Sequence, residues 1–575
     1  MNQRKLYVPQ GFYETRRWHD AKSLRRALDM AKTRLVVVSG AFLLAFLVIT
    51  GRLVDVSILR GGGEENSAQA RAFRGTNIRA DIVDRNGELL ATSLTTSSLY
   101  ANARVVIDAK EAAEKLTQVL PELNYKETCQ RLQSGKGFVW IARHLTPQKQ
   151  AEIIRLGIPG IYFRQDERRV YPHGELFSHV LGYTNIDNQG LGGIERKFNE
   201  ELLSKIEPLQ LSLDIRVQHV LRDEFLAGIE KFKAQGGAGI IMNVQTGEVV
   251  AMVSLPDFDP NQVGKMGSHK EALFNRITLG TYEMGSSFKI FNTALYLESG
   301  VGTLVTKFDV SSPLRVGRFR VKDFHTAHHP LPVAEVFTES SNIGAGKMAM
   351  QMGASLQKPF FEKLGFFQPA SLEVSEIGSP LYPKQWSEST TITAAYGYGV
   401  SISPLQLVTA VGGVVNKGVM QRPTLKKVNS SYVNKGIRIL SEKTSEIMCK
   451  LMYMVVAQGR SKKARVLGYE VGGKTGTANQ ISGRSYQEGS NMTSFVGAFP
   501  MSRPQYAVLI MVDRPQAIKE TYGFNAAGWN AAPIGGNVIR RSAPLLQVVP
   551  TSEGRLKPEA NPMLIHARAL QREGH

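Results

Sequence analysis

The chain has 575 residues, of which 42% are hydrophobic and 21% are charged, and its formal net charge is +20. This length is too great for one hydrophobic core and predicts two to four domains, and the composition excludes wholesale disorder. The positive charge suits nucleic acid, a membrane surface or an anionic polymer. Because the sequence has no zinc-knuckle, RNP-like or basic-aromatic segment, we expect no nucleic-acid partner.

The N-terminus has the pattern of a membrane anchor. Residues 35–51 are apolar except for Ser39 and Thr50, and at about 1.5 Å per residue they just cross a bilayer core. Residues 1–34 carry nine Lys or Arg against three Asp or Glu, so the positive-inside rule makes them a cytoplasmic basic tail. We expect residues 35–54 to be a single-pass transmembrane signal-anchor. The alternative, a cleaved signal peptide, lacks a small-x-small cleavage site in VITGRLVDV.

The segment 55–205 has a mixed α/β pattern. Short β-like runs alternate with helical ones such as DAKEAAEKLTQVL, and Asn86-Gly87 between apolar-alternating arms predicts a hairpin turn. No metal, nucleotide or nucleophile pattern occurs in it. We therefore expect a non-catalytic pedestal module that serves placement or partner contact.

A second domain is predicted over residues 206–550. GGAGIIMNVQTGEVVAMVSLP indicates two antiparallel strands that turn at residues 245–247, and SFVGAFP and YAVLIMVDRP indicate two more. A long stretch with helical periodicity separates these pairs. The arrangement predicts an α+β fold, an antiparallel sheet covered by helices. We expect residues 551–575 to be a loosely held tail.

The segment YEMGSSFKIFN places Ser286 three residues before Lys289. On a helix these two side chains share one face within about 6 Å, and Gly285 allows a tight entry. Ser286 at the positive end of the helix dipole, beside a neutral lysine, would be an activated nucleophile. The spacing alone is weak evidence, because Ser355 and Lys358 repeat it and such a pair is usually a helix cap with a solvated lysine.

Two later segments change this interpretation. TESSNIG has an S-x-N pattern at Ser340 and Asn342, and GGKTGTANQ has a K-T-G pattern that begins at Lys474. Each segment alone also fits an ordinary turn or hairpin. Together and in this order, S-x-x-K, S-x-N and K-T-G are the motifs of serine β-lactamases and penicillin-binding proteins.

The K-T-G segment also has a physical interpretation. On an extended strand Thr475 and Thr477 point to one face and Lys474 to the other, because the side-chain period is two residues. Two hydroxyls and an adjacent cation can seat a carboxylate. Gly476 lets a substrate backbone lie close to the strand.

With these motifs the chain resembles a class B penicillin-binding protein, specifically the division-type (FtsI-like) peptidoglycan D,D-transpeptidase. Further segments that carry the resemblance include RADIVDRNGELLA, RRVYPHGELFSHVLGYTN, GEVVAMVSLPDFDPN and YGYGVSISPLQLVTAVGGVVNKG. SSN at 340–342 is closer to the division type than to the elongation type, which more often has S-C-D. The resemblance implies a serine β-lactamase-like transpeptidase domain, a dimerisation-type pedestal, no cofactor and no metal.

The resemblance also implies the roles of the motif residues. Ser286 is expected to attack the penultimate D-Ala carbonyl of a stem pentapeptide, with Lys289 as general base. Ser340 is expected to relay a proton and Asn342 to orient Lys289. An amine of a neighbouring stem then resolves the acyl-enzyme. Lys474 is the fifth expected catalytic residue, because Ser340 relays the proton between it and the leaving or entering amine. Thr475, Gly476 and Thr477 are expected to bind the substrate, and the N–H groups of Ser286 and Thr477 to form the oxyanion hole.

The same resemblance implies a location and partners. It places the protein in the inner membrane at the division site, with a periplasmic catalytic domain that β-lactams inhibit, beside an FtsW-type glycan polymerase and other division proteins. The alternatives are a D,D-carboxypeptidase or β-lactam hydrolase, and a non-enzymatic β-lactam sensor or division scaffold. The anchor and pedestal argue against a free lactamase, and a cytoplasmic part of about 34 residues is small for a sensor.

The segment DFHTAHHP raises a different possibility, a metal site at His325, His328 and His329. No carboxylate or cysteine completes a recognised ligand spacing. A surface loop is therefore the favoured interpretation.

Overall fold

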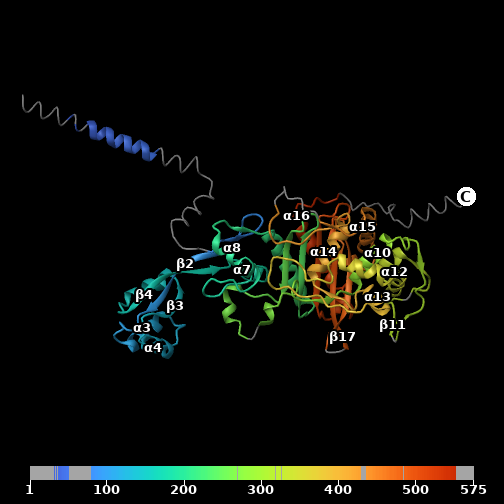
Figure 1. The fold of residues 1–575 in the computed structure, drawn as a ribbon, viewed down its shortest axis with the longest axis horizontal. Helices are drawn as coiled ribbons and strands as arrows, with labels where there is room; N and C mark the ends of the chain where they lie inside the picture. Colours follow the sequence, from blue (N-terminus) through green and yellow to red (C-terminus); the bar gives the residue numbers. More distant parts are fainter. Residues whose placement is uncertain are drawn as a thin grey trace, which may run out of the picture. The chain divides into compact units, whose positions relative to one another are not determined.

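The computed structural model describes residues 32, 34, 36–50 and 79–551, apart from 268–269, 318, 326, 429–435 and 483–484. The chain divides into two compact units, Met1–Thr76 and Asn77–His575. In the first unit, residues 36–50 form an α-helix whose side chains are exposed (Figure 1).

The membrane anchor stays a prediction. The described residues include no helix that has both the length and the apolar character needed to cross a bilayer. Of the predicted anchor at 35–54, position 35 and positions 51–54 lie outside the described residues, as does nearly all of the basic tail.

The second unit begins with a small sheet. β1 (Ile82–Val83) and β2 (Leu89–Ala101) form an antiparallel hairpin, and the Asp84 carboxylate holds its turn by accepting hydrogen bonds from the N–H groups of Asn86 and Glu88. The predicted Asn86-Gly87 turn is therefore present. β2 also pairs with β3 (Val139–Leu145) and β4 (Ile161–Val170), while β1 runs parallel to β5 (Leu209–Gln210).

Three helices cover one face of this sheet: α3 (Ala109–Val119), α4 (Tyr125–Leu132) and α5 (Pro147–Arg155). Each follows a residue whose side chain accepts a hydrogen bond from a first-turn N–H group, which favours helix initiation. These N-cap residues are Asp108, Asn124 and Thr146. Helices and strands share a small core of their own, which contains Leu99, Leu116, Ile141 and Ile153. This is the mixed α/β architecture that the sequence predicts for the pedestal.

A buried ion-pair cluster lies at the base of the pedestal. Arg79, just before β1, and Arg169, on β4, donate to the two carboxylate oxygens of Glu195 at 2.5 and 2.6 Å. Glu195 belongs to α7 (Gly193–Lys197), so the cluster joins three separate segments. The other short helices here are η2 (Gly174–Phe177), α6 (Ser178–Leu181) and α8 (Asn199–Ser204).

The following domain is built on a five-stranded antiparallel sheet of order β16-β17-β18-β6-β7. Its strands are β6 (Gly236–Asn243), β7 (Val249–Leu255), β16 (Gly472–Ser482), β17 (Ser485–Phe499) and β18 (Tyr506–Asp513). The strand pairs predicted at the two ends of the domain meet in one sheet, because β18 pairs with β6. β16, which carries the K-T-G motif, lies at an edge.

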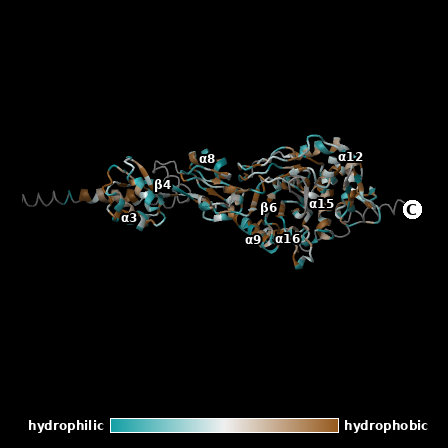
Figure 2. Ribbon diagram, turned by 90° about the horizontal axis from the view of Figure 1, so that it is seen from below, coloured by the Kyte–Doolittle hydropathy of each residue, from teal (hydrophilic) through white to brown (hydrophobic). Residues whose placement is uncertain are grey.

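Alternate residues of the strands build two cores. Val508 and Ile510 of β18 face α9 (Ile215–Lys231) and α16 (Ala531–Leu545), which lie side by side near β6 (Figure 2). The intervening Leu509 belongs to the larger core on the other face. A strand buried on both faces is apolar throughout, which explains the continuous run YAVLIMV.

The other face of the sheet carries the helices that come between β7 and β16, yellow-green to orange in Figure 1. They are α10 (Lys289–Glu298), α11 (Val333–Thr338), α12 (Asn342–Lys363, interrupted at Gly353), α13 (Glu388–Ala394), α14 (Pro404–Val415) and α15 (Glu442–Ala457). The α+β prediction, an antiparallel sheet covered by helices, is therefore confirmed.

Short elements connect these helices. The paired short strands are β8 (Tyr282–Glu283) with β13 (Ser401–Ile402), β9 (Lys307–Phe308) with β12 (Leu331–Pro332), β10 (Leu314–Val316) with β11 (Phe319–Val321), and β14 (Val419–Met420) with β15 (Ile437–Arg438). The 3-10 turns are η3 (Pro260–Lys265), η4 (Lys270–Leu273), η5 (Gly285–Phe288), η6 (Lys462–Ala464) and η7 (Lys519–Thr521). The predicted tail beyond residue 551 lies outside the described residues.

Candidate active site

Ser286 lies in the 3-10 turn η5, which leads directly into α10 at Lys289. The Lys289 Nζ is 3.0 Å from the Ser286 Oγ. Ser286 and Lys289 were predicted to share one α-helical face. The first turn is instead a tighter 3-10 turn, which still brings the two atoms within hydrogen-bond distance. Gly285 is required before this turn, because it has a φ of +54° and a Cβ there would lie 2.6 Å from the carbonyl oxygen of Thr477.

Four oxygen atoms surround the Lys289 Nζ. They are Asn342 Oδ1 at 2.6 Å, the Ser340 carbonyl oxygen at 2.8 Å, Ser286 Oγ at 3.0 Å and Ser340 Oγ at 3.2 Å. The amide and carbonyl oxygens can only accept hydrogen bonds, so they occupy two N–H groups of Lys289. A neutral amine then keeps its lone pair free to accept the proton of the Ser286 hydroxyl. The contacts therefore suit a base rather than a structural ammonium.

The Ser340 hydroxyl connects two lysines. Its Oγ is 2.9 Å from the Lys474 Nζ and 3.2 Å from the Lys289 Nζ. Ser340 lies between α11 and α12 with a φ of +63°, a conformation that is uncommon for a residue with a side chain. The structure thus brings together all five side chains that the sequence proposed as catalytic.

Both lysine side chains are about 1% exposed. Burial lowers the pKa of Lys289 well below its usual range, and the charges of Lys474 and Arg460 lower it further, against an opposing effect of Asp323. Burial, followed by the charge of Arg460, lowers the pKa of Lys474 to about 7, with Glu339 opposing. A lysine that is neutral near physiological pH can act as a general base.

β16 presents its threonines on the face opposite Lys474, as the strand period requires. Thr475 and Thr477 are half-buried, and the Thr477 Oγ1 accepts a hydrogen bond from the N–H of Ala527 at 3.3 Å. In the described sheet β16 pairs with β17 alone, so no strand pairs with its second edge. An edge strand offers backbone N–H and C=O groups to an added peptide strand.

Comparison with known proteins identifies the chain's family. The model of the penicillin-binding protein dimerisation domain matches residues 76–208, and the model of the penicillin binding protein transpeptidase domain matches residues 237–539. The chain belongs to the penicillin-binding protein transpeptidase family.

Its relatives narrow this assignment. A probable peptidoglycan D,D-transpeptidase FtsI of Caulobacter vibrioides is 36% identical over 92% of this chain and 91% of its own length. The peptidoglycan D,D-transpeptidase FtsI of Escherichia coli K12 is 28% identical, over 88% and 90%. A peptidoglycan synthetase structure from Bifidobacterium adolescentis shares the fold, with a TM-score of 0.64 at 22% identity, over 83% of this chain and 96% of that one. The chain is an FtsI-like class B penicillin-binding protein, as the motifs predicted.

One positioning residue of this penicillin-binding protein escaped the sequence analysis. The Asp323 carboxylate accepts hydrogen bonds from the Ser341 Oγ at 2.6 Å and from the N–H groups of Asn342 at 2.5 Å and Ile343 at 3.0 Å. Asp323 therefore fixes the start of α12, where Asn342 is held against Lys289. Its segment, VKDFHT, has no spacing that marks it as functional.

A contact within the protein already requires Gly476, and the expected approach of a substrate to this residue stays a prediction. A Cβ at this position would lie 2.4 Å from the Met284 carbonyl oxygen, 2.6 Å from the Ser287 Oγ and 2.7 Å from the Ser494 Oγ. Gly476 is thus required because η5 packs directly on β16, on the face opposite the threonines. The segment that approaches the β16 backbone closely at Gly476 is η5, the turn that carries Ser286.

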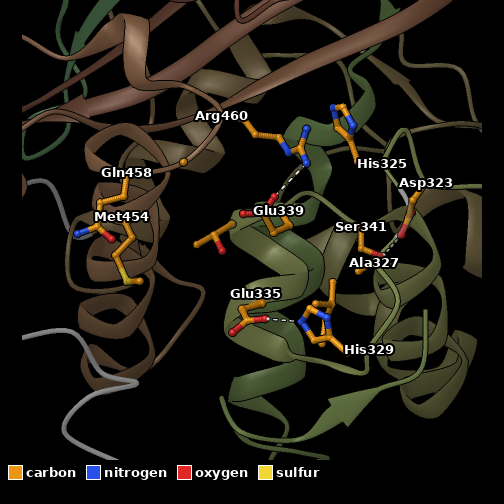
Figure 3. A pocket seen from close by; sticks show the side chains of 13 residues that line it. Asp323, His325, Ala327, His329, Glu335, Glu339, Ser341, Met454, Gln458 and Arg460 are labelled. Carbon is orange, nitrogen blue, oxygen red and sulfur yellow. Dashed lines mark hydrogen bonds and ion pairs between the residues drawn. The ribbon is translucent and has the colours of Figure 1, made fainter. Parts of the chain in front are cut away.

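The three histidines lie in the segment between β11 and β12. His329 Nε2 is 3.8 Å from Glu335 Oε2, and His325 packs edge-on against Phe324. Across the described part of the chain, no group of three or more His, Cys, Asp or Glu side chains is arranged to hold a metal ion. His325 and His329 instead line a cavity beside Ser341 (Figure 3).

Proposed function

We propose that this penicillin-binding protein is a serine D,D-transpeptidase that cross-links the stem peptides of peptidoglycan, with Ser286 as the nucleophile. The observation that carries the proposal is the 3.0 Å contact between Ser286 Oγ and a buried Lys289 whose N–H groups are directed to other acceptors. The relatives named as peptidoglycan D,D-transpeptidases support the substrate class.

In the first half-reaction, Lys289 takes the proton of Ser286 while the Oγ attacks the carbonyl carbon of the penultimate D-Ala. The bond between that carbon and the nitrogen of the last D-Ala breaks. The departing nitrogen takes the proton of the Ser340 hydroxyl, and the Lys474 ammonium group gives a proton to Ser340 in its place. The N–H groups of Ser286 and Thr477 are the proposed oxyanion donors, and one such donor is typically worth about 3–4 kcal/mol.

In the second half-reaction, an amine of a neighbouring stem attacks the ester carbon. It gives up a proton through Ser340, the new amide bond forms, and Ser286 regains its proton as the ester bond breaks. Thr475 and Thr477 would hold the terminal carboxylate of the donor stem, which can lie along the edge of β16 that pairs with no other strand. A β-lactam would acylate Ser286 by the same first half-reaction.

The proposed location is the inner membrane at the division septum. We propose residues 1–34 as cytoplasmic, 35–54 as the anchor, 55–205 as a partner-docking pedestal and 206–550 as the periplasmic catalytic domain, beside an FtsW-type polymerase. The excess of six positive charges before residue 35 supports the orientation, nine basic minus three acidic residues. External protease on spheroplasts should degrade the chain beyond residue 55, and a protected C-terminal half would contradict the topology. Depletion of the protein should give filamentous cells, and round cells would contradict the division role.

The test of the function is acylation in membranes. A fluorescent penicillin should label the wild type and fail to label Ser286→Ala. Ser287→Ala is the matched control, because the Ser287 Oγ contacts Ser494 rather than Lys289. Mass spectrometry should place the adduct on Ser286, and an adduct on Ser287 or Ser355 would contradict the assignment.

A further inference from the structure

A cavity of about 510 Å³ lies beside the turn that carries Ser340. Its walls come from the segment 323–331, from α11 with the turn after it, and from the end of α15 with residues 458–460 (Figure 3). Pockets for small molecules have volumes of about 300–1,000 Å³, so this one can hold an amino-acid residue. Asp323, Ser341 and Arg460 line it and also support the acylation site, but Ser286, Lys289, Ser340 and Lys474 are not among its lining residues.

The cavity begins on either side of Ser340. Glu339 and Ser341 both line it, while the hydroxyl of the residue between them contacts Lys289 and Lys474. Transpeptidation needs a second substrate, the acceptor, whose amine attacks the ester carbon. This attack is the reverse of the step in which the last D-Ala left the same carbon. The acceptor nitrogen must therefore occupy the position from which the nitrogen of that D-Ala departed. A cavity lined by both neighbours of Ser340 is therefore a place where the rest of an acceptor can lie.

Two carboxylates face this space. Glu335 and Glu339 lie one helical turn apart, and like charges at this spacing repel each other. Each has one basic neighbour: Arg460 Nη2 is 2.9 Å from Glu339 Oε2, and His329 Nε2 is 3.8 Å from Glu335 Oε2 (Figure 3). An ammonium group that enters between the carboxylates would relieve their repulsion.

The same cavity offers a seat for an anion. The Arg460 guanidinium has five N–H donors, and the bond to Glu339 leaves others available for a carboxylate. Ammonium and carboxylate seats side by side match the two charged groups of a free amino-acid centre. We propose that this cavity is the acceptor subsite, in which Glu335 and Glu339 attract the ammonium group of the incoming stem as it approaches, Arg460 pairs with a carboxylate on the same residue, and the nitrogen loses a proton and leaves the carboxylates to attack the ester beside Ser340; this rests on the transpeptidase function proposed above.

The test separates the two half-reactions in the purified full-length protein. The donor is a thioester of an N-acylated D-alanine, so that thiol release reports acylation of Ser286. D-Alanine is the acceptor, and the ratio of dipeptide to hydrolysed acid reports capture by the amine. Glu335→Gln removes a charge from the cavity, and Ala327→Leu narrows it without changing charge. Glu362→Gln, on the exposed surface of α12, is the matched control.

Glu335→Gln should raise the D-alanine concentration for half-maximal capture about three- to fivefold, the effect of one solvent-accessible charge pair. Ala327→Leu should raise it at least as much, and the control should leave it unchanged. Thiol release should stay within about twofold of wild type in all three, since Glu335, Ala327 and Glu362 make none of the acylation contacts described above. Added salt should weaken capture by the wild type more than by Glu335→Gln.

Capture by D-alaninamide, which lacks the carboxylate, should be weaker than capture by D-alanine in the wild type. If Glu335→Gln and Ala327→Leu capture D-alanine at wild-type concentrations, the acceptor subsite is overturned while the proposed function stands. If the wild type releases no thiol and forms no penicillin adduct, the proposed function itself fails. If one of the two variants also slows thiol release, the ratio of dipeptide to hydrolysed acid in the other variant decides whether the cavity is the acceptor subsite.

Discussion

The Oγ of Ser340 lies 2.9 Å from the Nζ of Lys474 and 3.2 Å from the Nζ of Lys289, so one hydroxyl joins two buried amines. Two ammonium ions held this close in a site shielded from water would repel each other strongly. The pair therefore favours a state with at most one positive charge near neutral pH. A proton can pass between the two amines through the hydroxyl without either side chain leaving its place.

Arg460→Gln should shift the pH profile of acylation to higher pH. Arg460 is among the charges that lower the pKa of Lys474 and of Lys289, second to burial in the first case, so both pKa values should rise when it is removed. The rate increases with pH as Lys289 becomes neutral, and it declines as Lys474 loses its proton near pH 7. Both the rising and the falling part of the pH profile should therefore shift to higher pH.

The measurement is the second-order rate constant for a penicillin across a range of about pH 5 to 9. Arg155→Gln, on the exposed surface of α5, is the control and should leave the profile in place. A profile of Arg460→Gln that stays unchanged, or moves to lower pH, would show that this guanidinium does not set the lysine pKa values.

Asp323→Ala should weaken both the fold and acylation. It leaves the N–H groups of Asn342 and Ile343 and the Ser341 hydroxyl without their acceptor, at about 1–3 kcal/mol for each buried group left unpaired. Because Asn342 then loses its fixed position against Lys289, acylation should fall about tenfold or more. Asp323→Asn keeps one acceptor oxygen and should recover part of both losses.

Denaturant unfolding and penicillin acylation of the two variants check this prediction. A merely structural role would lower stability and leave the acylation rate of the folded fraction unchanged, in Asp323→Ala as in Asp323→Asn.

The motif residues could be predicted because each motif spans only a few consecutive residues. The spacing of Ser286 and Lys289 brings them to one side of a turn, and the strand period separates Lys474 from its neighbouring threonines. Asp323 and Arg460 could not be predicted, since they reach the site from loops whose positions depend on tertiary packing. Gly476 was recognised, but the close approach of Met284 and Ser287 to it could not be predicted, because they belong to a distant segment.

In the fold, too, the features with a local sequence signal could be predicted and those that depend on tertiary packing could not. The strands β6, β7 and β18 could be predicted as buried apolar runs bounded by turns. The pairing of β6 with β18, which brings the two ends of the domain together, depends on how the whole chain folds back on itself and has no local signal.

Glu195→Ala should destabilise the pedestal severely. It leaves Arg79 and Arg169, both buried, without the carboxylate that compensates their charges. Breaking a buried ion pair in this way typically costs about 3–5 kcal/mol. The comparison is Glu127→Ala, which removes an exposed pair with Arg131 on α4 and should cost less than about 1 kcal/mol.

Thermal unfolding of the purified protein measures both variants. Penicillin acylation of the protein that remains folded should be close to wild type in each, because the cluster shares no contact with Ser286. Equal stability of the two variants would mean that the buried carboxylate contributes no more than a surface one.

The penicillin adduct on Ser286 should persist for many minutes. Rapid hydrolysis of the ester needs a base that holds a water molecule against it, and general-base help is typically worth about 10²- to 10⁴-fold. The carboxylate whose charge reaches Lys289 is Asp323, and its oxygens already accept hydrogen bonds from Ser341, Asn342 and Ile343.

Without such a base, an ester outlives its encounters with water, and an oriented amine wins because a bound nucleophile has a very high effective concentration. The measurement is a mass-spectrometric time course of the Ser286 peptide after free penicillin is removed. A lifetime of minutes fits a transferase that waits for its acceptor. Loss of the adduct within seconds would mean that a water molecule is activated at this site, and the chain would then be a hydrolase with the same first half-reaction.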